Sequence, residues 1–145
     1  MGTVREILSR KGSQVWSVGK EATVLDAALL MNEHRVGALV VLEEGRVAGM
    51  FSERDVLQRV VATQRDPVRT RVAEVMTEEV VCGTLETSIE EARGAMKNRR
   101  IRHLPLVDGD RRLLGLISIG DLNAHEATSQ EQTIHLLQEY LYGRA

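Results

Sequence analysis

The chain has 145 residues, of which 43% are hydrophobic and 28% charged, and its formal net charge is −2. This composition predicts a globular protein with a buried core, and the balanced charge and 3% aromatic content argue against nucleic-acid binding. No apolar stretch approaches the roughly 20 residues of a membrane span, and no signal peptide is recognisable, so we expect a cytoplasmic protein without membrane association. The single cysteine excludes an internal disulfide, and no metal-ligand spacing is present, so we expect no metal requirement.

In the first half of the chain, residues 14–18 are expected to form a short strand, followed by a helix whose apolar residues recur at helical spacing from Val24. Strands over 37–43 and 47–52 are separated by the turn EEGR, which is typical of a hairpin. A second helix is expected to begin at Ser52. The order β-α-β-β-α is thus predicted for this half.

The second half repeats this order. Strands are expected over 80–82, 103–108 and 113–118, and helices from Ile89 and from Ser118. Two such units in tandem predict an α/β (α+β) fold.

Direct self-similarity supports this organisation. Residues 22–57 align with residues 87–122, with one extra residue in the turn of the second copy, and the segment 62–71 links the two units. We therefore expect three parts, which are residues 1–66, residues 67–126 and a C-terminal helix over 127–145.

The C-terminal segment reads as a helix of its own, which Thr128 or Ser129 would cap. Its apolar face is formed by Ile134, Leu137 and Leu141. Two interpretations of this face stay open, because it either packs on its own domain or contacts a second subunit or a partner protein.

A short motif occurs at the same place in both units, as GMFSERD at 49–55 and GLISIGD at 115–121. Serine followed three residues later by an acid at a helix start is close to a capping box. A helix N-terminus is also a phosphate site, an acid there suits ribose hydroxyls, and the glycine lets a ligand or another backbone approach closely. The motif therefore indicates capping, ligand binding or both.

The tandem units, the two Gly-x-x-Ser-x-x-Asp segments and RRIRHLPLVD at 99–108 resemble a pair of CBS domains, the Bateman module, over about residues 3–125. This resemblance implies two repeats packed around a pseudo-twofold axis with two clefts between them. In the family these clefts bind adenosine-containing ligands such as AMP, ADP, ATP, NAD or S-adenosylmethionine. The resemblance also implies a disc-like homodimer.

The resemblance assigns ligand contacts in each cleft, with Asp55 and Asp121 binding the ribose hydroxyls. The first cleft would also use Ser52, Arg54, Thr77, Val80, Val81, Cys82, Arg102 and His103. The second cleft would use Ser118, Lys11, Ser13, Val15, Trp16, Val36, Gly37 and Ala38, with His103 facing the phosphate. Because the second motif has no counterpart of Arg54, we expect the first cleft to favour more phosphorylated ligands.

Some of these residues have a second interpretation. Trp16 is the only tryptophan and can be a core residue instead of an adenine contact. Cys82 is expected to be a small buried strand residue and not a reactive thiol. The arginines at 99–102 can form a solvated helix end instead of a phosphate site.

We therefore predict a regulatory adenine-nucleotide-binding module that acts on a separate partner. The alternative is a dimerisation or protein-interaction scaffold without a nucleotide role. An enzyme is not expected, because the sequence has no GxSxG motif, no Walker loop and no activated nucleophile pattern.

Overall fold

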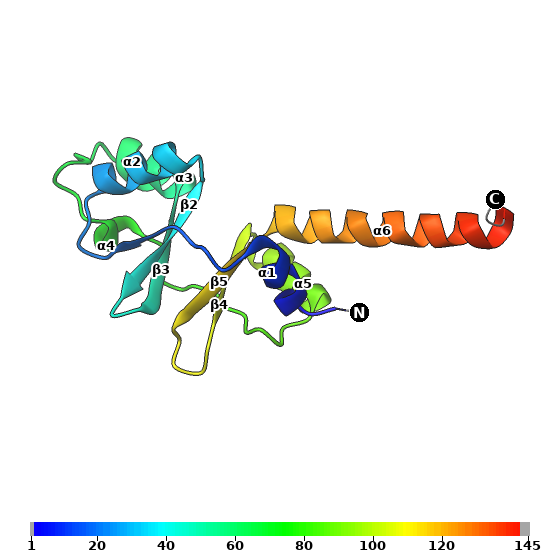
Figure 1. Ribbon diagram of the computed structural model, residues 1–145. Helices are drawn as coiled ribbons and strands as arrows, with labels where there is room; N and C mark the ends of the chain where they lie inside the picture. The colour runs from blue at the N-terminus through cyan, green and yellow to red at the C-terminus, as the bar shows by residue number, and fades with distance from the viewer. Residues whose placement is uncertain (1, 143–145) are drawn as a thin grey trace.

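Each repeat unit contributes a small sheet with helices packed on it, and a long helix projects from the second unit (Figure 1). The structure is a computed structural model that describes residues 2–142. Within those residues, none of the helices combines the length and apolar content that crossing a membrane would need.

The first unit has a three-stranded sheet in the order β1-β2-β3, with β1 parallel and β3 antiparallel to β2. Its elements are β1 (Ser17–Gly19), α2 (Val24–His34), β2 (Ala38–Glu43), β3 (Arg46–Ser52), α3 (Glu53–Asp55) and the π-helical η1 (Val56–Val61). The hairpin turn between β2 and β3 places Glu44 and Gly45 at φ of 53° and 79°. Such positive values match the right-handed twist of the flanking strands.

The second unit repeats the hairpin and both predicted helices, but it begins with a short helix, α4 (Val72–Val75), that the predicted order lacks, and one predicted strand is not formed. Its elements are α4 (Val72–Val75), α5 (Ile89–Arg99), β4 (His103–Val107), β5 (Leu113–Ser118) and α6 (Ile119–Tyr142). The strand predicted over 80–82 is wrong. Pairing with β4 is limited to a parallel bridge between Gly83 and Leu106, because Val80 and Cys82 instead pack into an apolar cluster with Val40 and Val107.

The leading helix of each unit completes the core of the other unit. Val4 and Ile7 of α1 (Val4–Lys11) are buried with the second unit's core, and Val72 and Val75 of α4 are buried with the first unit's core. The two junctions are equivalent. The Val4 amide donates to Thr87 O at 2.9 Å, and the Val72 amide donates to Ala22 O at 2.8 Å. These paired contacts give the two units their pseudo-twofold relationship.

Helices α2 and α5 begin and end in the same way. Thr23 and Ser88 form capping boxes at their N-termini, which satisfy amide groups that have no partner within the helix. Arg35 and Arg100 follow their C-termini in the left-handed conformation, at φ of 55° and 54°. Arg100 is thereby placed at the rim of the cleft described below.

The expected separate C-terminal helix is not formed, because α6 runs unbroken from the second motif to Tyr142. The Thr128 hydroxyl donates to Ala124 O within this helix and does not cap it, and the side chain of Ser129 and residues 143–145 lie outside the described residues. No glycine or proline interrupts residues 121–142, so nothing in the sequence stops the helix.

The outer half of α6 extends away from both sheets (Figure 1). Ile134, Leu137 and Leu141 are 55%, 53% and 66% exposed. The interpretation that this face packs on its own domain is therefore wrong, and contact with a second subunit or a partner protein stays a prediction.

Candidate functional site

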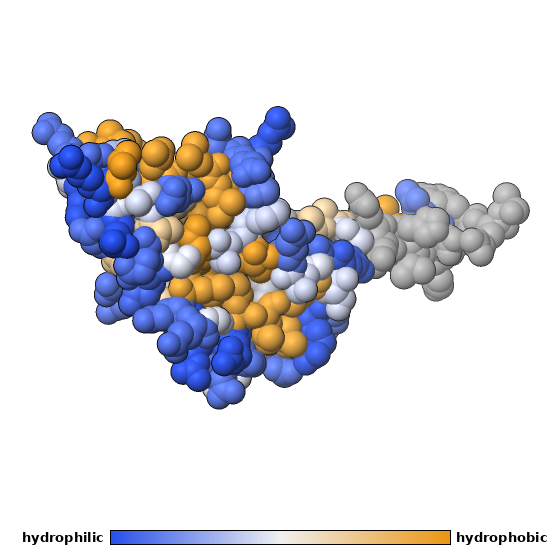
Figure 2. Space-filling view, turned by 60° about the vertical axis from the view of Figure 1, so that its left-hand side comes forward, coloured by the Kyte–Doolittle hydropathy of each residue, from blue (hydrophilic) through white to orange (hydrophobic). Residues whose placement is uncertain are grey.

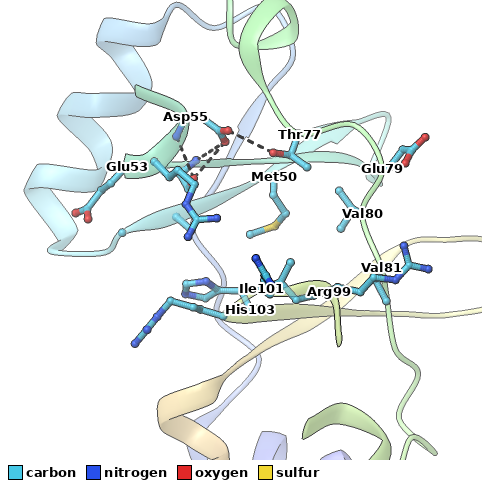
Figure 3. Close-up of a pocket in the computed structure, with 16 residues that line it drawn as sticks. Met50, Glu53, Asp55, Thr77, Glu79, Val80, Val81, Arg99, Ile101 and His103 are labelled. Carbon is cyan, nitrogen blue, oxygen red and sulfur yellow. Dashed lines mark hydrogen bonds between the residues drawn. The ribbon is translucent and has the colours of Figure 1, made fainter. Parts of the chain in front are cut away.

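A cleft of about 470 Å³ lies where the two units meet (Figure 3). Asp55 and Thr77 stand on one side of it, and Ile101 and His103 stand opposite. Its wall is made of Gly37, Ala38, Met50, Ser52, Glu53, Arg54, Asp55, Thr77, Glu79, Val80, Val81, Arg99, Arg100, Ile101, Arg102 and His103. The structure thus brings together all but one of the side chains proposed for the first cleft.

The buried carboxylate of Asp55 is held by contacts from both units. Its Oδ2 accepts hydrogen bonds from the Ser52 amide at 3.0 Å and the Ser52 hydroxyl at 3.2 Å, while Asp55 N donates to Ser52 Oγ at 3.3 Å. Its Oδ1 accepts from the Thr77 hydroxyl at 3.3 Å, and Arg59 Nε lies 3.8 Å away. The capping interpretation of this motif is confirmed. A carboxylate offers about four acceptor positions, so Oδ1 retains one for a further donor.

Four arginines line the same cleft, which are Arg54, Arg99, Arg100 and Arg102. They are exposed, and among the described side chains none of them forms an ion pair. The acidic residues of the wall are Glu53, Asp55 and Glu79. Planar guanidinium groups bind phosphate oxygens in pairs, so this rim is suited to a phosphorylated ligand.

The apolar part of the wall comes from Met50, Val80, Val81 and Ile101. A mostly apolar pocket with a few convergent polar groups is typical of small-molecule sites. Ile101 was absent from the sequence prediction. Its position in the repeat corresponds to Val36, which the prediction did include, so the alignment of the two units could have found it.

Cys82 does not line this cleft. Its side chain is half-buried in the cluster between the units, where Sγ lies 3.8 Å from Val80 O. Burial raises the pKa of the Cys82 thiol, with Arg111 opposing the change, so the thiolate is disfavoured. This agrees with the expectation of a structural residue, and its assignment as a ligand contact is not supported.

Gly37 and Ala38 line the first cleft, although they were assigned to the second. Ala38 pairs with Ser52 across β2 and β3, and the Glu53 amide donates to Gly37 O at 3.0 Å. The strand ladder therefore fixes both residues beside the first motif. Val36 faces a separate groove between α2 and η1.

The second motif is also a capping box. The Ser118 amide donates to Asp121 Oδ2 at 2.8 Å, and the Asp121 amide donates to Ser118 Oγ at 3.1 Å. Lys11 Nζ donates to the same Asp121 oxygen at 2.6 Å and to Leu116 O at 2.8 Å. Burial raises the pKa of Asp121, but the bonds from Lys11 and Ser118 outweigh it and leave that pKa below its ordinary value.

Two of the other residues assigned to the second cleft, Trp16 and Val15, pack inside the chain. The Trp16 ring stacks on His34, with ring centroids 3.5 Å apart and planes 10° apart, and it packs against the first core. Val15 packs into the cluster between the units, and Ser13 is exposed. The core interpretation of Trp16 is therefore favoured over an adenine contact.

His103 lies between the two motifs. It lines the first cleft, while Lys11 of α1 and Asp121 of the second motif act on its charge. Burial, followed by the positive charges of Lys11 and Arg102, lowers the pKa of His103, and Asp121 opposes the change.

The glycine of each motif marks a close approach between the units. A Cβ atom at Gly49 would lie 2.7 Å from Thr77 O and from Met76 Sδ, and a Cβ atom at Gly115 would collide with the Leu8 side chain. The expectation that glycine admits a close neighbour is confirmed at both positions.

The chain matches the CBS domain family twice, over residues 4–62 and 72–128, and it therefore belongs to the CBS-domain proteins. The CBS domain-containing protein YhcV of Bacillus subtilis is 37% identical over 130 residues, covering 90% of this chain and 89% of the relative. A solved CBS-domain structure from Burkholderia ambifaria is similar with a TM-score of 0.82 and 40% identity, covering 88% of this chain and 96% of that one. The predicted family and fold class are confirmed.

The CBS domain pair of protein MJ0100, solved with 5′-methylthioadenosine and S-adenosyl-L-methionine, is 19% identical with a TM-score of 0.77. The match covers 89% of this chain and 98% of that one, and it shows a shared fold. For metals, the described side chains of residues 2–142 contain no group of three or more His, Cys, Asp or Glu placed to hold an ion.

Proposed function

We propose that the protein is a regulatory module that binds an adenosine-containing ligand in the Asp55 cleft and acts on a separate partner protein. One observation carries this proposal, which is the meeting of a buried carboxylate, an apolar wall and four arginines in a single cleft. The carboxylate suits ribose hydroxyls, the apolar wall suits an adenine ring, and the guanidinium groups suit phosphates.

The candidate ligands are AMP, ADP, ATP, NAD and S-adenosylmethionine. The arginine rim favours those with phosphates, and affinity is expected to rise from AMP to ATP because each added phosphate can engage another guanidinium group. A protein of the same fold binds adenosine ligands, which is consistent with this class.

Regulation follows from where the cleft lies. Asp55 belongs to the first unit, whereas His103 on the opposite wall belongs to the second, so a ligand between them contacts both units. Such a ligand shifts the arrangement of the units only to the extent that it binds one arrangement better than another. No catalytic step is part of this proposal.

The experiment is a thermal-unfolding panel with AMP, ADP, ATP, NAD, S-adenosylmethionine and 2′-deoxy-AMP. A ligand at about 100 times its dissociation constant stabilises the folded state by about 2.7 kcal/mol, which is a shift of several degrees. The shift should vanish in Asp55→Ala, persist in the exposed control Asp110→Ala, and be smaller with the deoxy ligand. If no ligand shifts the transition, the alternative of a protein-interaction scaffold is favoured.

We also propose a homodimer that forms through the first unit. Its α2 and η1 expose large apolar side chains, and Figure 2 shows an apolar area over the first unit at the top of the view. The exposed residues are Leu25, Leu29, Leu57 and Val61. Their counterparts in the second unit are Glu90, Gly94, Asn123 and Ala127, so the apolar face is confined to one unit. An exposed apolar patch of this kind is typical of an interaction site.

Sedimentation velocity tests the dimer. Leu57→Glu places a charge on the apolar face and should give a monomer, while the same change at the counterpart, Asn123→Glu, should leave the dimer intact. A monomeric wild-type protein would contradict the proposal.

A further inference from the structure

Arg59 holds both partners of the hydrogen bond between Thr77 and Asp55. Its Nη1 atom donates to Val75 O at 3.2 Å and to Met76 O at 2.8 Å. These carbonyls lie at the C-terminal end of α4, and the peptide of Met76 leads directly into Thr77. The last carbonyls of a helix have no partner within the helix, so the guanidinium group fixes the chain there by satisfying two of them.

The same guanidinium group also faces the carboxylate. Arg59 Nε lies 3.8 Å from Asp55 Oδ1, which is the oxygen that accepts the Thr77 hydroxyl at 3.3 Å. Among the described side chains, no other cation forms an ion pair with Asp55, whose side chain is only 7% exposed. A buried carboxylate needs a counter-charge and fixed donors to keep one orientation. Arg59 supplies the counter-charge, and it fixes the Thr77 donor through the Met76 carbonyl.

Arg59 does not line the cleft, since it is not among the four arginines of the wall. It is therefore not placed to contact a ligand in the cleft. Any effect that it has on ligand binding passes through Asp55 and Thr77, which do line the wall.

The second unit does not repeat this bridge. His125 stands at the position that corresponds to Arg59, and its Nδ1 is buried without a hydrogen-bond partner in the part of the chain that the structure describes. Leu8 O, the counterpart of Met76 O, accepts a hydrogen bond from the Gly12 amide. The arginine bridge is thus a feature of the first motif.

Arg59 also lies in a stretch of unusual backbone. The π-helical η1 begins directly after Asp55, and the Ala62 amide donates to Leu57 O, five residues back, at 2.9 Å. The equivalent residues 122–127 belong to the α-helix α6. Because π-helical turns are rare and occur frequently at functional sites, this difference supports a function for the segment that carries Arg59.

We propose that Arg59 is a positioning residue of the Asp55 cleft, which holds the carboxylate and the Thr77 segment in the arrangement that receives the ribose hydroxyls. This inference rests on the proposed function. Without the bridge the carboxylate is free to turn from the ribose, so the preference of the site for a ribose over a 2′-deoxyribose should fall. A general loosening of the fold would instead weaken the binding of both sugars alike.

Isothermal titration calorimetry with AMP and with 2′-deoxy-AMP measures this preference. In Arg59→Met, AMP affinity should fall about tenfold, as expected for losing a hydrogen bond to a charged group. The affinity for 2′-deoxy-AMP should fall less, because that ligand has one hydroxyl fewer to lose. Arg59→Lys keeps the charge and should recover part of the preference, and Arg59→Gln provides a further variant if the methionine variant does not fold.

Arg65→Met is the matched control. Arg65 also joins the first unit to α4, through Glu74 at 2.6 Å, but it forms no ion pair with Asp55. This variant should keep the wild-type preference for AMP, whatever its stability.

The outcomes separate this inference from the function on which it rests. An unchanged ratio of the two affinities in a folded Arg59→Met or Arg59→Gln variant would overturn the inference while the Asp55 site remains. An equal loss of preference in Arg65→Met would also overturn it, because any contact with α4 would then have the same effect. If wild-type protein binds neither nucleotide, the proposed function fails together with the inference.

Discussion

The Thr77 hydroxyl donates to Asp55 Oδ1 across the boundary between the two repeat units, at 3.3 Å. This bond orients the carboxylate at the floor of the cleft, and it links the shape of the candidate site to the packing of the units. The residue at the equivalent place on α1 is Ser9, whose hydroxyl donates to Arg5 O within its own helix and does not reach Asp121.

Removing that hydroxyl should weaken ligand binding. Thr77→Val keeps the side-chain volume but leaves Asp55 without one of its partners, at a cost of about 1 kcal/mol, or roughly a fivefold loss of ATP affinity. Isothermal titration calorimetry measures the change. Ser9→Ala, at the equivalent position, should bind ATP as wild type does, and equal affinities for all three proteins would contradict the role given to Thr77.

Arg54 should discriminate between ligands by their phosphate number. Its guanidinium lies on the cleft wall without an ion-pair partner among the described side chains, so Arg54→Gln removes a charge that phosphates would otherwise meet. We expect ATP affinity to fall about tenfold and AMP affinity to fall less, since a hydrogen bond to a charged group contributes about 1.5–3 kcal/mol. Arg69→Gln, an exposed residue paired with Asp66, is the control. Equal losses for both ligands would show that Arg54 does not bind phosphate.

His103 should make stability depend on pH near neutrality. Burial, followed by the charges of Lys11 and Arg102, lowers the pKa of His103 below its ordinary value of 6.5. Between the lowered pKa and 6.5 the unfolded chain binds more protons than the folded one. The stabilisation from neutral His103 is therefore present above 6.5 and is lost as the pH falls toward the lowered pKa of the folded state.

Urea unfolding at about pH 7.5 and about pH 5 tests this assignment. The loss of unfolding free energy on acidification should be smaller in His103→Gln than in wild type. A variant with the same loss would show that His103 does not titrate differently on folding.

Gly49 should tolerate no larger residue. An added Cβ would meet the Thr77 carbonyl and the Met76 sulfur at 2.7 Å, and the backbone atom cannot move aside cheaply. Gly49→Ala should lower the unfolding free energy by about 1–3 kcal/mol. Gly94→Ala is the control, because this helical position has no heavy atom within 4 Å, and alanine there should stabilise by about 1 kcal/mol. Equal stabilities of the two variants in urea would contradict the close approach.

The two hairpins and the helices α2 and α5 agree with the prediction because each depends on local patterns that occur twice, whereas the short leading helices α1 and α4 were not predicted. Helical spacing, capping residues and turn residues can each be recognised within a few positions of the sequence, and the repeat shows each pattern a second time. Ser52 and Asp55 lie together on the cleft wall because the motif spacing fixes both at one helix start. The continuous α6 could also have been predicted, since no glycine or proline separates Asp121 from Tyr142.

Contacts between side chains that lie far apart in the sequence could not be predicted from local patterns. Lys11 was assigned to the second cleft, but its ion pair with Asp121 joins residues 110 positions apart, and nothing local distinguishes it from a solvated lysine. The Trp16 and His34 stack is likewise a tertiary contact. Cys82 lies outside the first cleft, because in place of the predicted strand over 80–82 its side chain packs between the units.

Because the two repeats exchange their leading helices, they are not two independent domains joined by a linker. Cutting the chain between the repeats would give a first half without Val72 and Val75 in its core and a second half without Val4 and Ile7. Each half would expose an apolar surface that only the other half can cover. Each repeat therefore needs the other to complete its core, whether or not the cleft between them holds a ligand.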